Sequence, residues 1–142
     1  HKFFRRRPPK STGRKEFGCE FAGAFFASAR KKRIAPHDML ATVTALTARS
    51  IADAYRRFLP GPVDEVILCG GGARNRTLTR MLEEAVSPAV VRSTSDFGID
   101  ADAKEAVSFA ILAAQSIRGA AGNVPAATGA KRSVVLGKII PA

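Results

Sequence analysis

Apolar positions follow a helical spacing in some segments of this chain and form short unbroken runs in others. Residues 38–58 carry one apolar stripe at helical spacing, preceded by Asp38 as a candidate N-cap. The stripe, in which Thr47 is the one polar member, consists of Leu40, Val43, Thr47, Ile51, Ala54 and Phe58. Helices are also expected over residues 15–29, 75–86 and 102–118, and residues 1–14 are expected to be irregular.

An unbroken apolar run, Val66–Cys69, lies inside a strand predicted over residues 63–70. Because the run does not alternate with polar residues, we expect both faces of this strand to be covered, with Cys69 buried. Further strands are predicted over residues 89–92 and 134–140. The alternation of helices and strands predicts an α/β fold, layered, with a mostly parallel sheet and flanking helices.

The positive charge is concentrated at one end of the chain. Of the net charge of +11, residues 1–33 hold eleven Lys or Arg against two Glu, whereas the other residues hold twelve against ten. Phenylalanines lie among these charges, a pattern found in some RNA-binding proteins. A nucleic-acid-binding module is therefore one hypothesis, and a steeply salt-dependent affinity for RNA would support it. No nucleic-acid-binding signature is present, so a solvated basic surface is the favoured interpretation.

Other classes of protein are disfavoured by composition. No apolar run approaches the roughly 18 residues of a membrane span, and no metal-ligand spacing occurs. Two cysteines make no disulfide framework and fit a reducing cytoplasm. Neither His37 nor any serine completes a catalytic triad.

The glycine turn that follows the first predicted strand is the strongest candidate site. Gly70, Gly71 and Gly72 lack a Cβ, and Asn75 is a good N-cap for a helix whose free N–H groups favour anions. The turn completes neither the dinucleotide fingerprint nor the Walker loop, because Arg74 and Asn75 occupy the deciding positions. A tight turn without a ligand is the alternative.

A second candidate is Glu105, near the start of the last predicted helix. Asp102 and Glu105 have the spacing of a capping box, and from the residues alone a helix cap is the favoured interpretation of this pair. The alternative is that Glu105 accepts hydrogen bonds from a polyhydroxyl ligand. Arg74 is a candidate for an adenine face or a phosphate.

Several segments, in this order, resemble the C-terminal part of bacterial anhydro-N-acetylmuramic acid kinases, from about Pro8 to Pro141. The segments are Pro8–Phe17, Leu40–Ile51, Leu68–Asn75, Gly98–Ala106, Pro125–Ala130 and Val135–Lys138. The resemblance implies part of the second lobe of an actin- and Hsp70-like ATPase fold. It also implies transfer of a phosphoryl group from ATP, with Mg²⁺, to 1,6-anhydro-N-acetylmuramic acid, with opening of the anhydro ring, in cell-wall recycling.

The resemblance also assigns site residues. Gly70, Gly71, Gly72 and Ala73 look like an adenosine-binding loop, flanked by Arg74 and Asn75. Glu105 looks like a contact to the substrate sugar, whereas the motif from Lys10 to Arg14 receives no firm role. Residues 1–37 would form a basic segment and residues 38–142 an incomplete nucleotide-binding lobe.

The family's general base is an Asp in the segment Asp-Thr-Gly-Pro-Gly-Asn, which this sequence lacks. No catalytic residue is therefore assigned in this chain, and no metal ligand. We expect it to be part of a longer enzyme, dependent on a missing N-terminal lobe and without turnover alone. An inactive structural remnant is a further alternative, and a homodimer is an open expectation.

Overall fold

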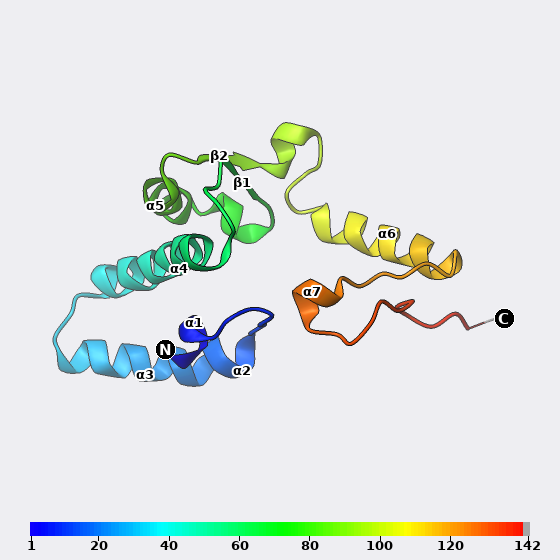
Figure 1. The fold of residues 1–142 in the computed structure, drawn as a ribbon. Helices are drawn as coiled ribbons and strands as arrows, with labels where there is room; N and C mark the ends of the chain where they lie inside the picture. Colours follow the sequence, from blue (N-terminus) through cyan, green and yellow to red (C-terminus); the bar gives the residue numbers. More distant parts are fainter. Residues whose placement is uncertain (141–142) are drawn as a thin grey trace.

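The computed structural model describes residues 1–140, so Pro141 and the last residue of the predicted second domain lie outside the described residues. Helices and short strands follow one another along an open, extended chain (Figure 1). In order they are α1 (Lys2–Arg5), α2 (Arg14–Phe17), α3 (Cys19–Lys31), α4 (Pro36–Phe58), β1 (Glu65–Leu68), the 3₁₀ turn η1 (Gly71–Arg74), α5 (Arg76–Val86), β2 (Val90–Ser93), the 3₁₀ turn η2 (Thr94–Phe97), α6 (Lys104–Ile117) and α7 (Pro125–Thr128).

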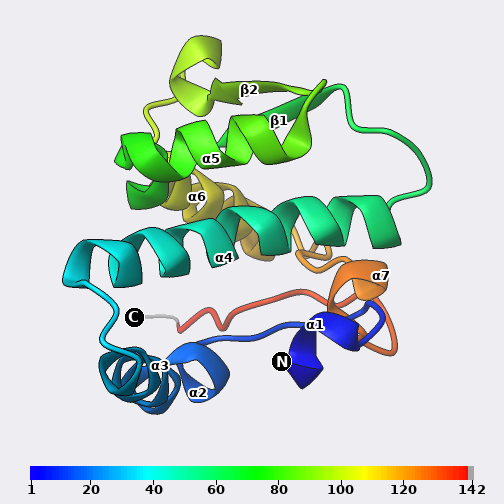
Figure 2. The same cartoon turned by 90° about the vertical axis from the view of Figure 1, so that its left-hand side faces the viewer.

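Two parallel strands and two helices form the core. β1 pairs with β2 so that Val66 lies opposite Val91. The helices α5 and α4 lie on the same side of these strands (Figure 2). Buried Ala48, Val66 and Leu82 form the centre of this packing. The predicted α/β fold, with a parallel sheet and flanking helices, is confirmed.

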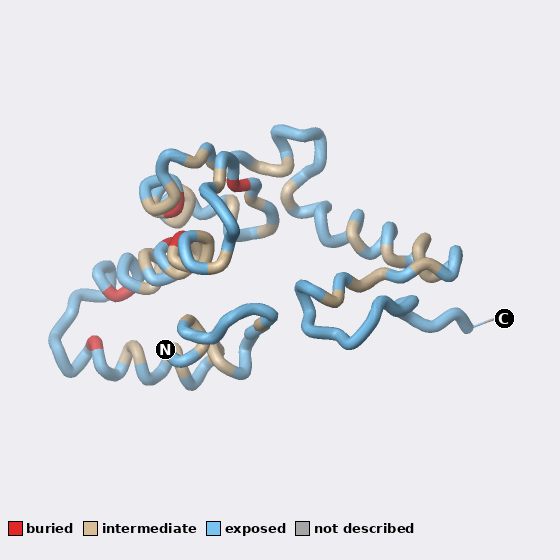
Figure 3. The backbone as a smooth tube through the Cα atoms, viewed as in Figure 1, coloured by how far each residue is buried: buried red, intermediate tan, exposed pale blue. Residues whose placement is uncertain are grey.

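One face of the sheet is bare, which corrects the expectation that β1 is covered on both sides (Figure 3). Val66 is buried, whereas Ile67 is 49% exposed and Val90 54% exposed. Cys69 is also exposed, not buried as predicted. The unbroken apolar run indicated a doubly covered strand, but no described element packs on the side of Ile67.

The two acidic N-caps predicted for α4 and α6 are wrong. α4 begins at Pro36, with Ala35 as N-cap, because the fixed φ of proline suits the first helical position. At α6, the Asp102 N–H donates to the Asp100 carboxylate over 2.8 Å, and the helix begins at Lys104 with Ala103 as its N-cap. The capping box expected between Asp102 and Glu105 is therefore absent.

α4 packs through only one part of the predicted stripe, at Ile51, which lies against the core. Its buried residues are Met39, Ala48 and Ala52, whereas Leu40 is 57% exposed. Ala48 belongs to the core shared with α5, where its small side chain lets the two helices approach closely.

Glycine divides the predicted helix over residues 15–29 into α2 and α3. A Cβ on Gly18 would lie 2.1 Å from the Arg14 carbonyl oxygen, so only glycine fits there. The one-turn helix α1 also lies within the segment expected to be irregular.

Residues 134–140 form no strand, contrary to prediction. They run beside α6 as an extended tail. The Val134 carbonyl accepts from the Gly122 N–H over 3.1 Å, and the Val134 N–H donates to the Asn123 side chain over 2.7 Å. Strands need a neighbouring strand, and none lies beside this tail among residues 1–140. No helix described here combines the length and apolar character required to cross a bilayer.

Candidate functional site

The glycine turn joins β1 to α5. Gly70 has φ +76°, in the left-handed region that favours glycine. Gly71–Arg74 then form the 3₁₀ turn, and the Asn75 side chain accepts from the Leu78 N–H over 3.1 Å. The prediction that Asn75 caps this helix is confirmed.

The turn is open rather than packed under side chains. A Cβ added to Gly70 or Gly71 would meet no atom within 4 Å, and one on Gly72 would meet only Leu78, at 3.8 Å. A ligand can therefore approach the backbone of this turn closely, at the carboxyl end of a parallel strand where ligands of α/β sheets gather.

A hollow of about 240 Å³ lies at the turn and brings the two candidate segments together. Its lining includes Gly70 and Gly71 from one side and Glu105 from the start of α6 on the other. The Gly70 N–H donates to the Ala101 carbonyl over 2.8 Å, which holds the two segments together. Glu105, placed by the sequence 34 positions beyond Gly71, thus shares one pocket with it.

Four of the predicted site residues, from Gly72 to Asn75, do not line this hollow. Arg74 forms an ion pair with Asp102, with both side chains half or more exposed. The pairing joins the glycine turn to the segment before α6. Arg74 therefore has a protein partner where the sequence suggested a ligand.

Sequence reasoning missed three residues of the lining: Cys69, Ala101 and Lys104. Lys104 lines the hollow together with Asp102 and Glu105, so its lining residues carry both signs of charge. A lysine at a helix start has no distinctive sequence signal. Asp102, which also lines the hollow, did have a sequence signal: its spacing from Glu105, which we interpreted as that of a helix cap.

No metal centre is visible in residues 1–140: these hold no group of three His, Cys, Asp or Glu side chains placed to bind an ion.

The phenylalanines of the basic segment pack mainly against one another. Phe17 lies 5.7 Å from Phe3, 5.4 Å from Phe4 and 5.1 Å from Phe21, measured between ring centroids. The rings are half-buried, whereas Arg5, Arg6 and Arg7 are exposed. These rings are thus engaged within the protein, and the arginines face solvent.

Comparison with known proteins places the chain in a family. The family model for anhydro-N-acetylmuramic acid kinase matches residues 1–142. Curated relatives named anhydro-N-acetylmuramic acid kinase include those of Gloeobacter violaceus, 50% identical over 99% of this chain, and Cyanothece sp., 47% identical over 98%. The relative from Salinibacter ruber is 45% identical over 96%. The chain spans 36%, 37% and 35% of the length of these three relatives. It belongs to the anhydro-N-acetylmuramic acid kinase family.

Proposed function

We propose that this chain contains part of the nucleotide-binding lobe of a cytoplasmic kinase acting in peptidoglycan recycling and amino sugar catabolism. The kinase would convert 1,6-anhydro-N-acetylmuramic acid to N-acetylmuramic acid 6-phosphate, hydrolysing the anhydro ring and using ATP. Family membership supports this proposal. The observation that carries it is the shared pocket, where an open glycine backbone faces Glu105.

Each side of the pocket fits a different part of the reaction. The bare backbone of Gly70 and Gly71 leaves room for the flat adenosine group, with Gly72 and Ala73 continuing the loop and Asn75 ordering the start of α5. The Glu105 carboxylate is an acceptor for sugar hydroxyls. Lys104, on the same rim, offers a cation to a phosphate.

The chemical step would depend on a lobe outside this chain. Phosphoryl transfer needs mainly positioning and charge neutralisation, together with a base for the attacking group. We assign no base here and expect an Asp of the N-terminal lobe to supply it. Mg²⁺ keeps most of its water and is bound largely through substrate phosphates, so it would enter with ATP rather than at a site of this chain. The basic segment, residues 1–37, would precede the lobe proper, residues 38–142.

A chimera tests the proposal. The 140 matched residues of the Gloeobacter violaceus relative would be replaced by this chain, and turnover of ATP with the anhydro sugar measured in a coupled assay. We expect turnover by the chimera and none by the isolated chain. A folded but inactive chimera, or turnover by the isolated chain, would contradict the proposal.

Glu105→Gln in the same chimera tests the sugar contact. Loss of a charge-assisted hydrogen bond should lower kcat/KM for the sugar roughly 10- to 100-fold. Glu84→Gln is the matched control, because Glu84 pairs with Arg80 on the outer surface of α5, at 2.7 Å, away from the pocket. Equal kcat/KM values for the two variants would show that Glu105 does not contact the sugar.

A further inference from the structure

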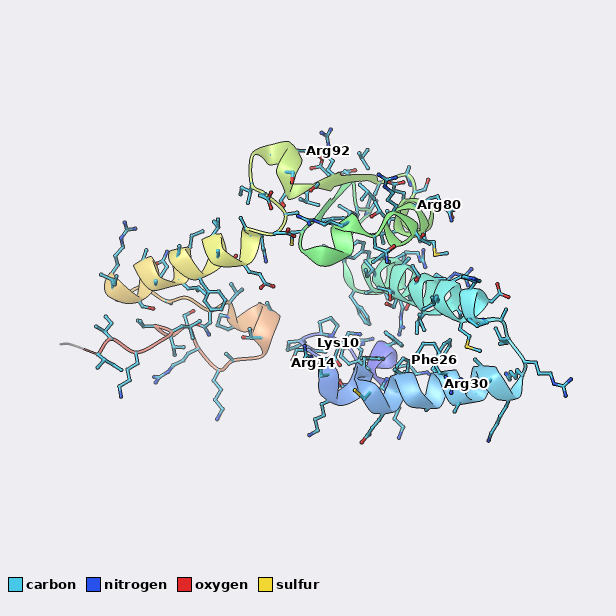
Figure 4. The ribbon with its side chains drawn as sticks, turned by 180° about the vertical axis from the view of Figure 1, so that it is seen from behind. Lys10, Arg14, Phe26, Arg30, Arg80 and Arg92 are labelled. Carbon is cyan, nitrogen blue, oxygen red and sulfur yellow. The ribbon has the colours of Figure 1, made fainter. Side chains whose placement is uncertain are left out.

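The motif from Lys10 to Arg14, to which the proposed function gives no role, begins with a lysine that makes several contacts. The Lys10 ammonium lies 4.8 Å from the centre of the Phe3 ring and 4.4 Å from that of Phe58. It also donates to the carbonyl oxygens of Phe3, over 3.3 Å, and Phe4, over 3.5 Å. Lys10 therefore joins the N-terminal segment to the end of α4 (Figure 4).

Arg57 strengthens the same junction. Its guanidinium donates to the Phe4 carbonyl over 3.1 Å and lies 5.1 Å from the Phe58 ring centre. Lys10 and Arg57 thus both bind the Phe4 carbonyl in α1, and Lys10 also contacts Phe58 at the end of α4.

Pro9, the residue before Lys10, lies close to Gly129 in the C-terminal half of the molecule. We call residues 104–140, which include α6 and α7, the C-terminal arm. A Cβ built on Gly129, at the end of α7, would lie only 3.2 Å from Pro9 Cγ. Figures 1 and 2 agree in placing α7 beside the loop between α1 and α2.

The arm is held at its opposite end by the candidate pocket. The Gly70–Ala101 hydrogen bond and the Arg74–Asp102 ion pair join the segment before α6 to the glycine turn. Between these ends α6 leaves Phe109 71% exposed and Ile117 76% exposed, so its own apolar side chains do little to fix it. The placement of Glu105 relative to Gly70 therefore depends on the contacts at both ends.

We propose that Lys10 is a positioning residue for the pocket. By fixing the turn against α4, it holds Pro9 against Gly129 and thereby sets the position of the C-terminal arm. The arm in turn sets the separation between the glycine turn and Glu105.

Hydrogen exchange at the Gly70 amide, followed by NMR in the full chain without nucleotide, tests this role. Lys10→Glu places a carboxylate beside two carbonyl oxygens and two ring faces, so the arm should loosen and Gly70 exchange about tenfold faster. Lys10→Met should give a smaller rise, and Lys10→Arg, which keeps the charge, a rate close to that of the unmodified chain. The control is Lys15→Glu, the same charge change at an exposed position of α2.

Three results would overturn the proposal. The first is unchanged Gly70 exchange in folded Lys10→Glu and Lys10→Met variants. The second is an equal rise at the buried Leu82 amide, which would report global destabilisation. The third is an equal rise in Lys15→Glu. If Lys10→Glu does not fold, Lys10→Met decides the matter, and because no nucleotide is present the outcome is independent of the proposed kinase function.

Discussion

Gly71 is the residue at which the candidate pocket can be closed with least disturbance of the fold. Its surroundings leave a Cβ free of contacts within 4 Å, and its φ does not lie in the positive range. Gly71→Val should therefore fold normally while filling the space proposed for adenosine. We expect ATP affinity, measured by calorimetry with the chimera, to fall at least about tenfold, or roughly 1.4 kcal/mol.

Gly61→Val is the matched control for this change. Gly61 has equally open surroundings and lies in the loop before β1, away from the glycine turn. Unaltered ATP binding by folded Gly71→Val would exclude the turn as the nucleotide site.

Single residues also show where sequence reasoning succeeds. Asn75 was predictable as a cap because its side chain serves the helix that directly follows it. That Glu105 and Gly71 line one pocket had no local signal, since spacing alone does not bring them together. The ion pair between Arg74 and Asp102 had no local signal, because it joins residues from separate loops.

Among the elements, α5 is the one whose start depends most clearly on one side chain. Asn75→Ala removes the acceptor for the Leu78 N–H, so the free energy of unfolding should fall by about 1 kcal/mol. Urea unfolding measures this. Thr77→Ala, an exposed substitution in the same first turn, should change the unfolding free energy by no more than about 0.5 kcal/mol, and an equal loss in both variants would contradict the capping role.

The bounds of an element were predictable where residues within it or next to it set them. They were not predictable where contacts with distant segments set them. α5 lies within one residue of its predicted range, because Asn75 begins it and Pro88 follows its end. β1 is shorter than predicted, and residues 134–140 form no strand, because pairing requires partners that no local pattern supplies. The stripe predicted for α4 was right at Ile51 and wrong at Leu40, because the side that meets α5 is occupied by the small side chain of Ala48, which an apolar pattern does not single out.

For the whole molecule, stability depends on a small core. Leu82 is 2% exposed and packs with Ala48 and Val66. Leu82→Ala should cost about 2–5 kcal/mol, a large share of the roughly 5–15 kcal/mol typical of a folded domain. Urea denaturation with Leu40→Ala as control checks this, because Leu40 is 57% exposed and should contribute little. Similar midpoints for the two variants would show that this cluster is not the core.

The extended C-terminal arm also predicts how the isolated chain behaves in concentrated solution. Phe109 and Ile117 expose apolar area that favours self-association. The double variant Phe109→Ser, Ile117→Ser should associate less in sedimentation velocity while keeping its unfolding midpoint. Unchanged self-association of the double variant would show that these side chains of α6 do not form the self-association surface.

The exposure of Cys69 provides a chemical reporter within the native sequence. This thiol lines the hollow beside Gly70, whereas the second exposed thiol, Cys19, belongs to α3. A maleimide reagent should alkylate both, and an occupant of the hollow should shield Cys69 while leaving Cys19 as an internal standard. Mass spectrometry of the two labelled peptides can therefore reveal occupancy without any engineered tag.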